Sequence, residues 1–313
     1  MAAPTHERRP SADAPHEDTG EPWSRRRVRI TLLALVGVAV VGIVLVAVTA
    51  VVLVPDSPTR AVAQIGDPSA LTEGLFVRAT LRTASPESGD LAVQLAFDPS
   101  AQLTRDGRLV SPVVVDVNDT RGASPITFAT GDTMATTDVT IVMNGSRVTR
   151  YPFDRYDATL VVTARAGTGS AARPIALRVE VVGNLTDFTV KEGSKPASSA
   201  GAVVLPVTVR RSIGVLVWAL MFLVLIWLIG LGTVSIVFRI VAHATVIPIW
   251  SWAVFVSVLF ALPQLRSGLP GDPPYGSFVD WAGFYWVVTI VTLGFVTLVI
   301  AWNHAERTTN ASR

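Results

Sequence analysis

Four long apolar runs constrain the fold of this chain more than any other feature of its sequence. The first, Ile30–Val54, contains no charged residue, and a helix of that length, rising about 1.5 Å per residue, crosses a hydrocarbon core of ~30 Å. Three more runs cover residues 213–238, 241–262 and 282–302. All but one of the tryptophans lie in or beside these three runs, as expected of amphipathic rings at headgroup depth. We therefore predict four transmembrane helices, with the lipid bilayer as a partner.

The composition agrees with a membrane protein. Only 16% of the residues are charged, against about a quarter in soluble domains, and the mean hydropathy is +0.47. A net charge of +2 is too small to indicate a nucleic-acid partner. The chain has no cysteine, which excludes disulfides, thiolate nucleophiles and zinc–thiolate sites. Lys191 and Lys195 are the only lysines, and this preference for arginine is typical of a GC-rich bacterial genome.

The region before the first run has the composition of a disordered tail. Residues 1–29 are rich in proline, serine and charge and show no hydrophobic period, so we predict a disordered cytoplasmic segment. Arginines precede the run at 30–54, which leaves a cleaved signal peptide as the alternative to a membrane helix. A signal peptide has an apolar region of about 7–15 residues and a small-residue cleavage site. This run is longer and ends in VVLVP, which favours an uncleaved signal anchor.

The arginines that flank the four spans predict the orientation. An even number of spans places both termini on one side, and arginine is enriched on the cytoplasmic side. Cytoplasmic termini, including a tail at 303–313, leave residues 55–211 outside. This arrangement puts seven flanking arginines inside and four outside, although the outside pair Arg210 and Arg211 counts against it. The inside set is Arg25, Arg26, Arg27, Arg29, Arg239, Arg307 and Arg313, and the outside set is Arg60, Arg210, Arg211 and Arg266.

Residues 55–211 alternate between apolar and polar side chains as β-strands do. In GDLAVQLAF, Leu91, Val93, Leu95 and Phe97 share one face, and RPIALRVEVVG repeats the pattern. Turn-forming segments such as SPESG and DTRGASP separate these strands from others. Further strand-like segments lie near 75–84, 110–118, 136–143, 157–165 and 202–209. We predict an α+β membrane protein, with an extracytoplasmic β-sandwich of immunoglobulin-like or jelly-roll type and four transmembrane helices.

The sequence contains no recognisable catalytic constellation. None of the four histidines (6, 16, 243 and 304) lies in the predicted outer domain, which argues against a Ser–His–Asp triad or a histidine metal site there. Asp116, Asn118 and Asp119 in DVNDTRG lack the glycine and glutamate spacing of a calcium loop, so we predict a turn. We expect no cofactor, no metal and no enzymatic activity. A site built only from carboxylates remains the open alternative.

The predicted spans carry hydroxyl groups but no charge in their interiors. Transporters usually expose an ionisable group inside the bundle, so the absence of Asp, Glu, Lys and Arg disfavours that class. Hydroxyl groups could line a pore, or they could bond back to their own helices, which is the interpretation we favour. The residues in question are Thr233, Ser235, Ser251, Ser257, Thr289, Thr292 and Thr297.

Two segments are too distinctive to be ordinary connections. One is YPFDRY at 151–156, and the other is a proline- and glycine-rich strap at 263–281, predicted to be irregular rather than helical. We predict that the turn packs on the strap through Tyr151 and Phe153, with Asp154 capping the turn or pairing with Arg155 or Arg266. An ordinary strand-entry turn is the alternative. The predicted coupling residues are Tyr151, Pro152, Phe153, Asp154, Arg155, Tyr156, Arg266, Pro270, Gly271, Pro273, Pro274 and Asp280.

These motifs carry a family resemblance. YPFDRY, the strap PGDPPYG…DWAGFYW and the order of tail, span, β-domain and three spans resemble the uncharacterised bacterial membrane family catalogued as domain of unknown function 4436. The resemblance implies this architecture and no particular activity. The YPFD turn is also similar to a loop that presses on the membrane domain in pentameric ligand-gated channels. The extra N-terminal span, the three later spans and the lack of a cysteine pair depart from that pattern.

The function indicated is therefore general. We expect a multi-pass cell-membrane protein whose outer β-sandwich docks on its helices and binds or scaffolds another envelope protein, an envelope component or a second copy of the chain. The alternative is an oligomeric channel or sensor that couples the sandwich to the transmembrane helices.

Overall fold

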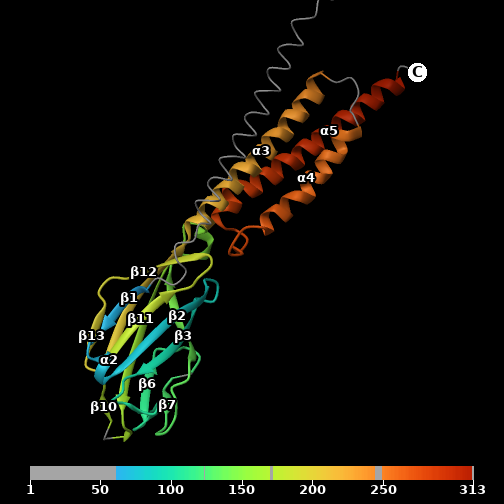
Figure 1. Cartoon of the computed structure of the whole chain (residues 1–313). Coiled ribbons are helices and arrows are strands. Elements are labelled where there is room, and N and C mark those ends of the chain that lie inside the picture. Colours follow the sequence, from blue (N-terminus) through green and yellow to red (C-terminus); the bar gives the residue numbers. More distant parts are fainter. Residues whose placement is uncertain (1–60, 123, 170–171, 244–248, 312–313) are drawn as a thin grey trace, which may run out of the picture. The chain divides into compact units, whose positions relative to one another are not determined.

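A β-sheet domain followed by long apolar helices makes up the part of the chain that the structure describes (Figure 1). The structure, a computed structural model, describes residues 61–311 except 123, 170–171 and 244–248. The chain divides into two units, 1–54 and 55–313, and the described residues all belong to the second. The predicted tail at 1–29 and the predicted span at 30–54 lie outside the described residues.

The sheet domain consists of β-strands with a single-turn helix, α2 (Ala70–Glu73), and a 3-10 turn, η1 (Val148–Arg150). The strands that the apolar alternation predicted are present, together with shorter ones that carry too few residues to show a period. The strands are β1 (Ala61–Gly66), β2 (Leu75–Ser85), β3 (Asp90–Pro99), β4 (Thr104–Arg105), β5 (Arg108–Leu109), β6 (Val113–Val117), β7 (Ile126–Phe128), β8 (Thr137–Gly145), β9 (Arg155–Ala166), β10 (Arg173–Pro174), β11 (Leu177–Gly183), β12 (Phe188–Glu192), β13 (Ala197–Ser199) and β14 (Ala202–Arg211).

The main sheet follows the order β1-β11-β2-β3-β8-β9-β14-β12. Neighbours along this path are antiparallel except β11 and β2, which run parallel. Strand β8 joins two halves of the path, because residues 137–142 pair with β3 whereas residues 143–145 pair with β9. Strands β6 and β10 also pair with β9, and β13 pairs with β14. The start of β9 and the end of β14 therefore lie side by side, with Arg155 opposite Arg210.

One apolar core fills the sheet domain, and the alternation in the sequence explains it. Leu91, Val93 and Leu95 of β3 are fully buried, as the two-residue period predicts. On β11, Leu177 and Val179 are buried in the same cluster, while Glu180 on the opposite face pairs with Arg78 of β2 at 3.0 Å. Truncating one of these leucines to alanine is expected to cost about 2–5 kcal/mol.

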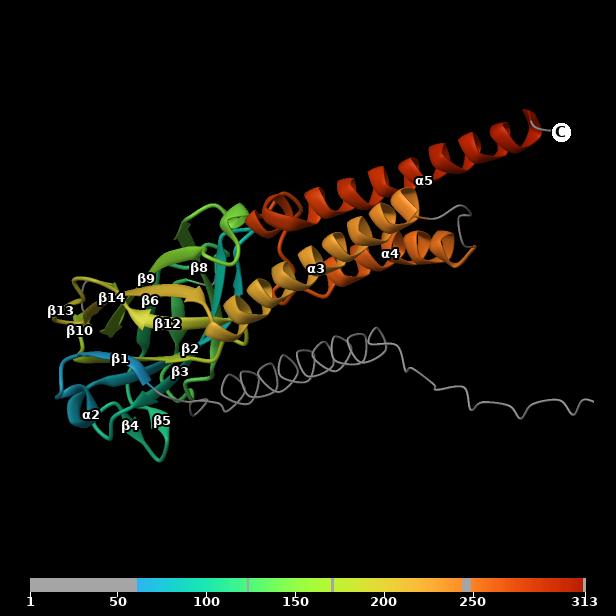
Figure 2. The ribbon, with the colours of Figure 1, turned by 90° about the horizontal axis from the view of Figure 1, so that it is seen from above.

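Three helices of the described region are long and apolar enough to span a membrane. Helix α3 (Ile213–His243) begins one residue after β14, and α4 (Ile249–Ser267) and α5 (Tyr285–Ala311) follow, with a π-helical turn, η3 (Asp280–Phe284), before α5. The chain is thus a multi-pass membrane protein. Figure 2 shows α3, α4 and α5 running side by side, and they share a second apolar cluster that includes Ile226, Phe255 and Val291.

The helix ends differ from those read in the sequence. Helix α3 continues past Arg239, and α4 passes through Pro263 to Ser267, so the irregular part of the predicted strap is only 268–277. Proline is tolerated in membrane helices because neighbouring groups can satisfy the freed carbonyl groups. Because residues 263–267 are helical, Arg266 lies where it can form an ion pair with Asp280. The prediction of a wholly irregular strap was therefore wrong at both of its ends.

Candidate functional site

The turn that follows η1 connects the sheet domain to the helices. Tyr151 N donates to Val148 O at 3.1 Å and Phe153 N donates to Arg150 O at 2.8 Å, and the Tyr151–Pro152 peptide bond is cis. Tyr151 is fully buried, and it packs in the apolar cluster of the helices rather than in the core of the sheet. Its hydroxyl donates to Pro270 O at 3.0 Å. The turn therefore inserts an aromatic side chain of the sheet domain into the helical part. We use the name junction for this region. It consists of the turn 151–154, Arg211, the loop 268–277, Arg266 and Asp280.

On the sheet side of the junction, Asp154 forms a buried ion pair with Arg211. Arg211 Nε lies 3.2 Å from Oδ1 and 3.0 Å from Oδ2 of Asp154, and the two side chains are 3% and 0% exposed. Tyr156 donates its hydroxyl to Asp154 Oδ2 at 2.8 Å. Burial raises the pKa of the hydroxyl groups of Tyr151 and Tyr156, and the nearby Asp154 carboxylate raises both further. Both tyrosines are accordingly neutral hydrogen-bond donors at physiological pH.

Arg211 is enclosed by aromatic rings and by the loop. Its guanidinium carbon lies 4.3 Å from the centre of the Phe188 ring and 5.0 Å from that of Tyr151. Gly271 of the loop has a φ of +73°, and a Cβ built there would lie 2.1 Å from Arg211 Nη1. Only glycine fits this conformation and this close approach. Among the described residues, the buried Nη1 makes no hydrogen bond.

On the helix side of the junction, Arg266 and Asp280 form a second buried ion pair. Arg266 donates through Nε to Asp280 Oδ1 and through Nη2 to Oδ2, both at 3.1 Å, and Nη2 also donates to Pro273 O at 2.8 Å. Asp280 Oδ2 accepts from the backbone amides of Gly276 and Ser277 at 2.9 and 3.1 Å and from the Ser277 hydroxyl at 3.0 Å. The Arg266 guanidinium lies 4.2 Å from the centre of the Tyr275 ring. These contacts fix the loop between α4 and α5.

The structure brings most of the predicted coupling residues together but pairs them differently. The proposed pairing of Asp154 with Arg155 or Arg266 was wrong, because Asp154 pairs with Arg211 and Arg266 pairs with Asp280. Arg155 lies on the surface, where Asp157 is 3.6 Å away. Pro152 and Pro273 are buried, Pro274 is half-buried, and Gly271 contacts Arg211.

Sequence reasoning missed the central residue of the sheet side, Arg211. It was counted only as a charge that flanks a span. Its partner is 57 residues away in sequence, but one local signal could have found it: the two-residue period that buries Val207 and Val209 also places Arg211 on the buried face and leaves Arg210 exposed. Phe188 and Phe278 were also missed, and the rings of Phe153 and Phe278 meet edge to face with centres 5.6 Å apart.

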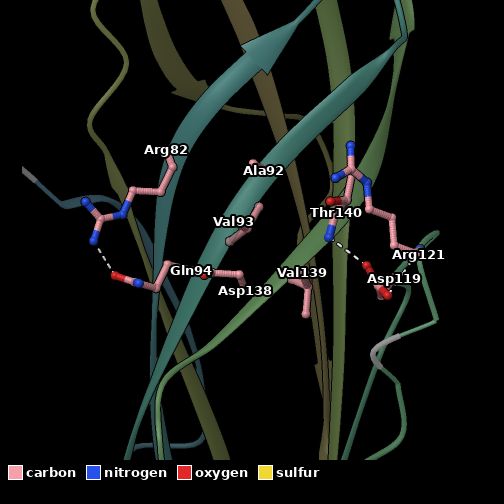
Figure 3. Close-up of a pocket in the computed structure, with 9 residues that line it drawn as sticks. All are labelled: Arg82, Ala92, Val93, Gln94, Asp119, Arg121, Asp138, Val139 and Thr140. Atoms are coloured by element: carbon pink, nitrogen blue, oxygen red, sulfur yellow. Dashed lines mark hydrogen bonds between the residues drawn. The ribbon is translucent and has the colours of Figure 1, made fainter.

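A separate surface cavity of about 390 Å³ lies on the sheet domain, over β3 and β8 (Figure 3). Arg82 donates to Gln94 in this cavity, and Thr140 N donates to Asp119 Oδ1 at 2.6 Å. Asp119 belongs to the segment for which we predicted a turn, and Asn118 of the same segment bonds Thr159 O and Val161 N across β9. The cavity is lined by Arg82, Ala92, Val93, Gln94, Asp119, Arg121, Asp138, Val139 and Thr140. Among the residues described, no three His, Cys, Asp or Glu side chains gather as metal ligands would.

Two family models match the chain. Residues 65–210 match the family described as Domain of unknown function (DUF4436), and residues 211–305 match the one described as Domain of unknown function (DUF8686). The boundary between the two matches falls between Arg210 and Arg211, inside the junction. Neither description mentions pentameric channels, so that resemblance remains a prediction. No curated protein matches the chain. The chain is therefore similar to DUF4436 over its β-sheet domain, which includes the turn motif, and to DUF8686 over its three apolar helices, which include the strap, so both matches are to domains of unknown function.

Proposed function

We propose that this protein is a cell-envelope binding or scaffolding protein that holds its β-sheet domain in a fixed orientation on its membrane helices. The sheet domain is the part that engages another envelope protein, an envelope component or a second copy of the chain. We further propose that it is a sandwich of immunoglobulin-like or jelly-roll type outside the cytoplasm, that residues 30–54 form a fourth span as a signal anchor, and that the protein catalyses no reaction.

The observation that carries this proposal is the insertion of Tyr151 into the helical cluster, next to the Asp154–Arg211 pair. Buried ion pairs contribute little net stability compared with apolar residues, but their strict geometry favours one arrangement over others. A flexible tether would need neither a buried tyrosine nor a glycine in van der Waals contact with a buried arginine. Fixed orientation is the property that a scaffold needs, because it presents the same surface of the domain to every partner.

The location of the sheet domain is tested by cysteine labelling in intact cells, which is direct because the chain has no cysteine of its own. Leu71, which is 57% exposed on α2, is replaced by cysteine and treated with a membrane-impermeant maleimide. We expect Leu71→Cys to react in intact cells. The matched variant Asn303→Cys, near the end of α5, should react only after permeabilisation. The reverse pattern would overturn the proposed orientation.

The binding role is tested by placing a photo-crosslinking amino acid at Leu71 or at Val110, both exposed on the sheet domain. We expect discrete protein adducts from at least one of these positions, either with another protein or with a second copy. Phe260, which is 75% exposed on α4, is the control position and should yield lipid adducts only. If both sheet positions yield no adduct in the native host, the binding role is wrong.

The second candidate, an oligomeric channel or sensor, is favoured by one observation. Strand β14 ends at Arg211 and α3 begins at Ile213, so a displacement of the strand passes to a membrane helix through a single residue. The hydroxyl groups give it no support: Thr233, Thr289 and Thr292 each donate to the carbonyl oxygen four residues earlier in their own helix, as do Ser235 and Thr297. Native mass spectrometry of the protein released from lipid nanodiscs separates the candidates. A stable ring supports the channel, and a monomer argues against it.

A further inference from the structure

An exposed aromatic pair lies at the edge of the junction. Phe153 of the sheet domain is 55% exposed and Phe278, two residues before the start of η3, is 45% exposed, although their rings contact each other. The neighbouring Tyr151 is fully buried. Phe153 therefore buries only part of its side chain in the protein, and removing the rest of its apolar surface from water would be favourable.

Tryptophans on η3 and α5 indicate where this pair lies relative to a bilayer. Trp281 is 63% exposed and Trp302 is 46% exposed, and their separation of 21 positions in the sequence corresponds to roughly 31 Å of helix. This length matches the ~30 Å thickness of a hydrocarbon core, whose two boundaries tryptophan prefers. At the Trp302 end, Trp252 of α4 contacts Trp302 with ring centres 6.2 Å apart. Phe278 lies one helical turn before Trp281, so Phe278 and Phe153 lie at headgroup level.

Exposed arginines surround the same turn of the sheet domain. Arg147 and Arg150 precede it, and Arg155 at the start of β9 lies directly opposite Arg210 on β14. Like charges opposite each other on a sheet repel, and an anion from outside the protein relieves this repulsion. Asp157 offsets part of the charge, since it lies 3.6 Å from Arg155 in an exposed pair of little strength. The loop carries one further exposed carboxylate, Asp272, so the arginines remain in excess.

We propose that this edge of the sheet domain is a lipid-contact surface that selects anionic phospholipid headgroups. Phe153 and Phe278 insert at headgroup level, and Arg147, Arg150, Arg155 and Arg210 bind the phosphate-bearing headgroups of the same leaflet. A short apolar insertion and a basic cluster are each weak alone, but together they hold a protein surface at a membrane. The surface adjoins η3 at the start of the last membrane helix, and it assigns a role to Arg210, which otherwise counts against the predicted orientation.

The insertion is tested by electron paramagnetic resonance of the full chain in nanodiscs. Phe153→Cys and, separately, Phe278→Cys carry a nitroxide, with Leu71→Cys at the far end of the sheet domain as the control. We expect the labels at 153 and 278 to collide more with oxygen than with a water-soluble nickel chelate, and the label at 71 to show the reverse. A label at 153 that is as accessible to nickel as the control overturns the proposal. A label at 153 that is shielded from both reagents also overturns it, because a protein partner then covers the surface.

The headgroup preference is tested with spin-labelled lipids in the same nanodiscs. We expect phosphatidylglycerol to associate with the protein roughly threefold or more over phosphatidylcholine at low salt, and the excess to fall as salt is added. The variant with all four arginines replaced by glutamine should lose the preference. A matched variant with Arg105, Arg108, Arg165 and Arg173 replaced by glutamine removes the same charge from the far end and should keep it. Equal lipid selectivity in the two variants overturns the proposal.

Discussion

Arg211 and Arg266 are both buried beside an aspartate at the junction, but they use their hydrogen-bond donors differently. Arg266 engages both oxygens of Asp280 with two different nitrogen atoms and also reaches a backbone carbonyl group. Arg211 directs a single nitrogen atom at both oxygens of Asp154, and its Nη1 is buried without a hydrogen bond among the described residues. Arg211 instead lies between two aromatic rings.

This difference separates two roles. The Arg266 pair lies within the helical part and holds the loop between α4 and α5 through two parallel hydrogen bonds to Asp280 and a third to Pro273 O. The Arg211 pair lies where the loop closes over the sheet domain, and its contacts with the loop are packing contacts with Gly271. A buried donor without a partner costs roughly 1–3 kcal/mol, so the sheet side of the junction is held less tightly than the helix side. The predictions below test this ranking.

Removing the charge of Asp280 should have the largest effect. In Asp280→Asn, the buried Arg266 loses its counter-ion, and the loop amides of Gly276 and Ser277 lose a charged acceptor. We expect the free energy of unfolding to fall by about 3–5 kcal/mol. Chemical denaturation in nanodiscs, followed by tryptophan fluorescence from the helices, measures it. Asp272→Asn on the same loop is the control, and because Asp272 is exposed its loss should stay within about 0.5 kcal/mol.

Removing the charge of Asp154 should cost less. In Asp154→Asn, Arg211 keeps its contacts with Tyr151 and Phe188, and these rings continue to stabilise the cation. We expect a loss of about 2–4 kcal/mol, with faster hydrogen exchange at the start of β9 and the end of β14. Asp157→Asn removes a carboxylate from an exposed pair nearby and should cost under about 1 kcal/mol. A loss that exceeds the one from Asp280→Asn would reverse the ranking of the two sides.

The close approach of the loop to Arg211 is tested by adding one methyl group. Both Gly271 and Gly276 have a positive φ, but a Cβ at Gly276 meets nothing within 4 Å whereas one at Gly271 collides with Arg211 Nη1. We expect Gly276→Ala to cost about 1 kcal/mol from backbone strain alone, and Gly271→Ala to cost about 2 kcal/mol. Thermal unfolding of the two variants in nanodiscs gives the comparison. Equal losses would mean that the loop does not close on Arg211.

The residues that could be predicted are those whose position depends on local periodicity. Alternation along β3 and β11 predicted which side chains are buried, and the long apolar runs predicted α3, α4 and α5, because burial and lipid exposure act on every residue of an element. The turn and the loop were recognised by their composition. Their partners within the junction depend on strand pairing, which brings residues 154 and 211 together and which no local pattern encodes.

The ends of the elements were predicted less well, and Pro263 illustrates why. A proline usually ends a helix in water, since its ring removes a hydrogen bond. Here α4 continues for four more residues, to Ser267, because Arg266 gains Asp280 and Pro273 as partners. A tertiary contact thus overrides a local preference, and the same contact shortens the irregular loop to 268–277.

The smallest expected effect is the pH dependence of the free energy of unfolding that comes from Tyr151 and Tyr156, which is absent at neutral pH. The pKa of Tyr151 and of Tyr156 is raised in the folded state, mainly by burial, whereas in the unfolded chain both titrate near 10. Folding stability is therefore unaffected below about pH 10 and falls above it, because the unfolded state loses these protons first. We expect a slope of about 1.4 kcal/mol per pH unit for each tyrosine. Denaturation at pH values from about 9 to 11 measures it, and Tyr151→Phe and Tyr156→Phe should each remove half of the fall. If Tyr151→Phe leaves the slope unchanged while Tyr156→Phe abolishes it, then the hydroxyl of Tyr151 is solvated in the protein and its hydrogen bond to Pro270 O does not hold the loop.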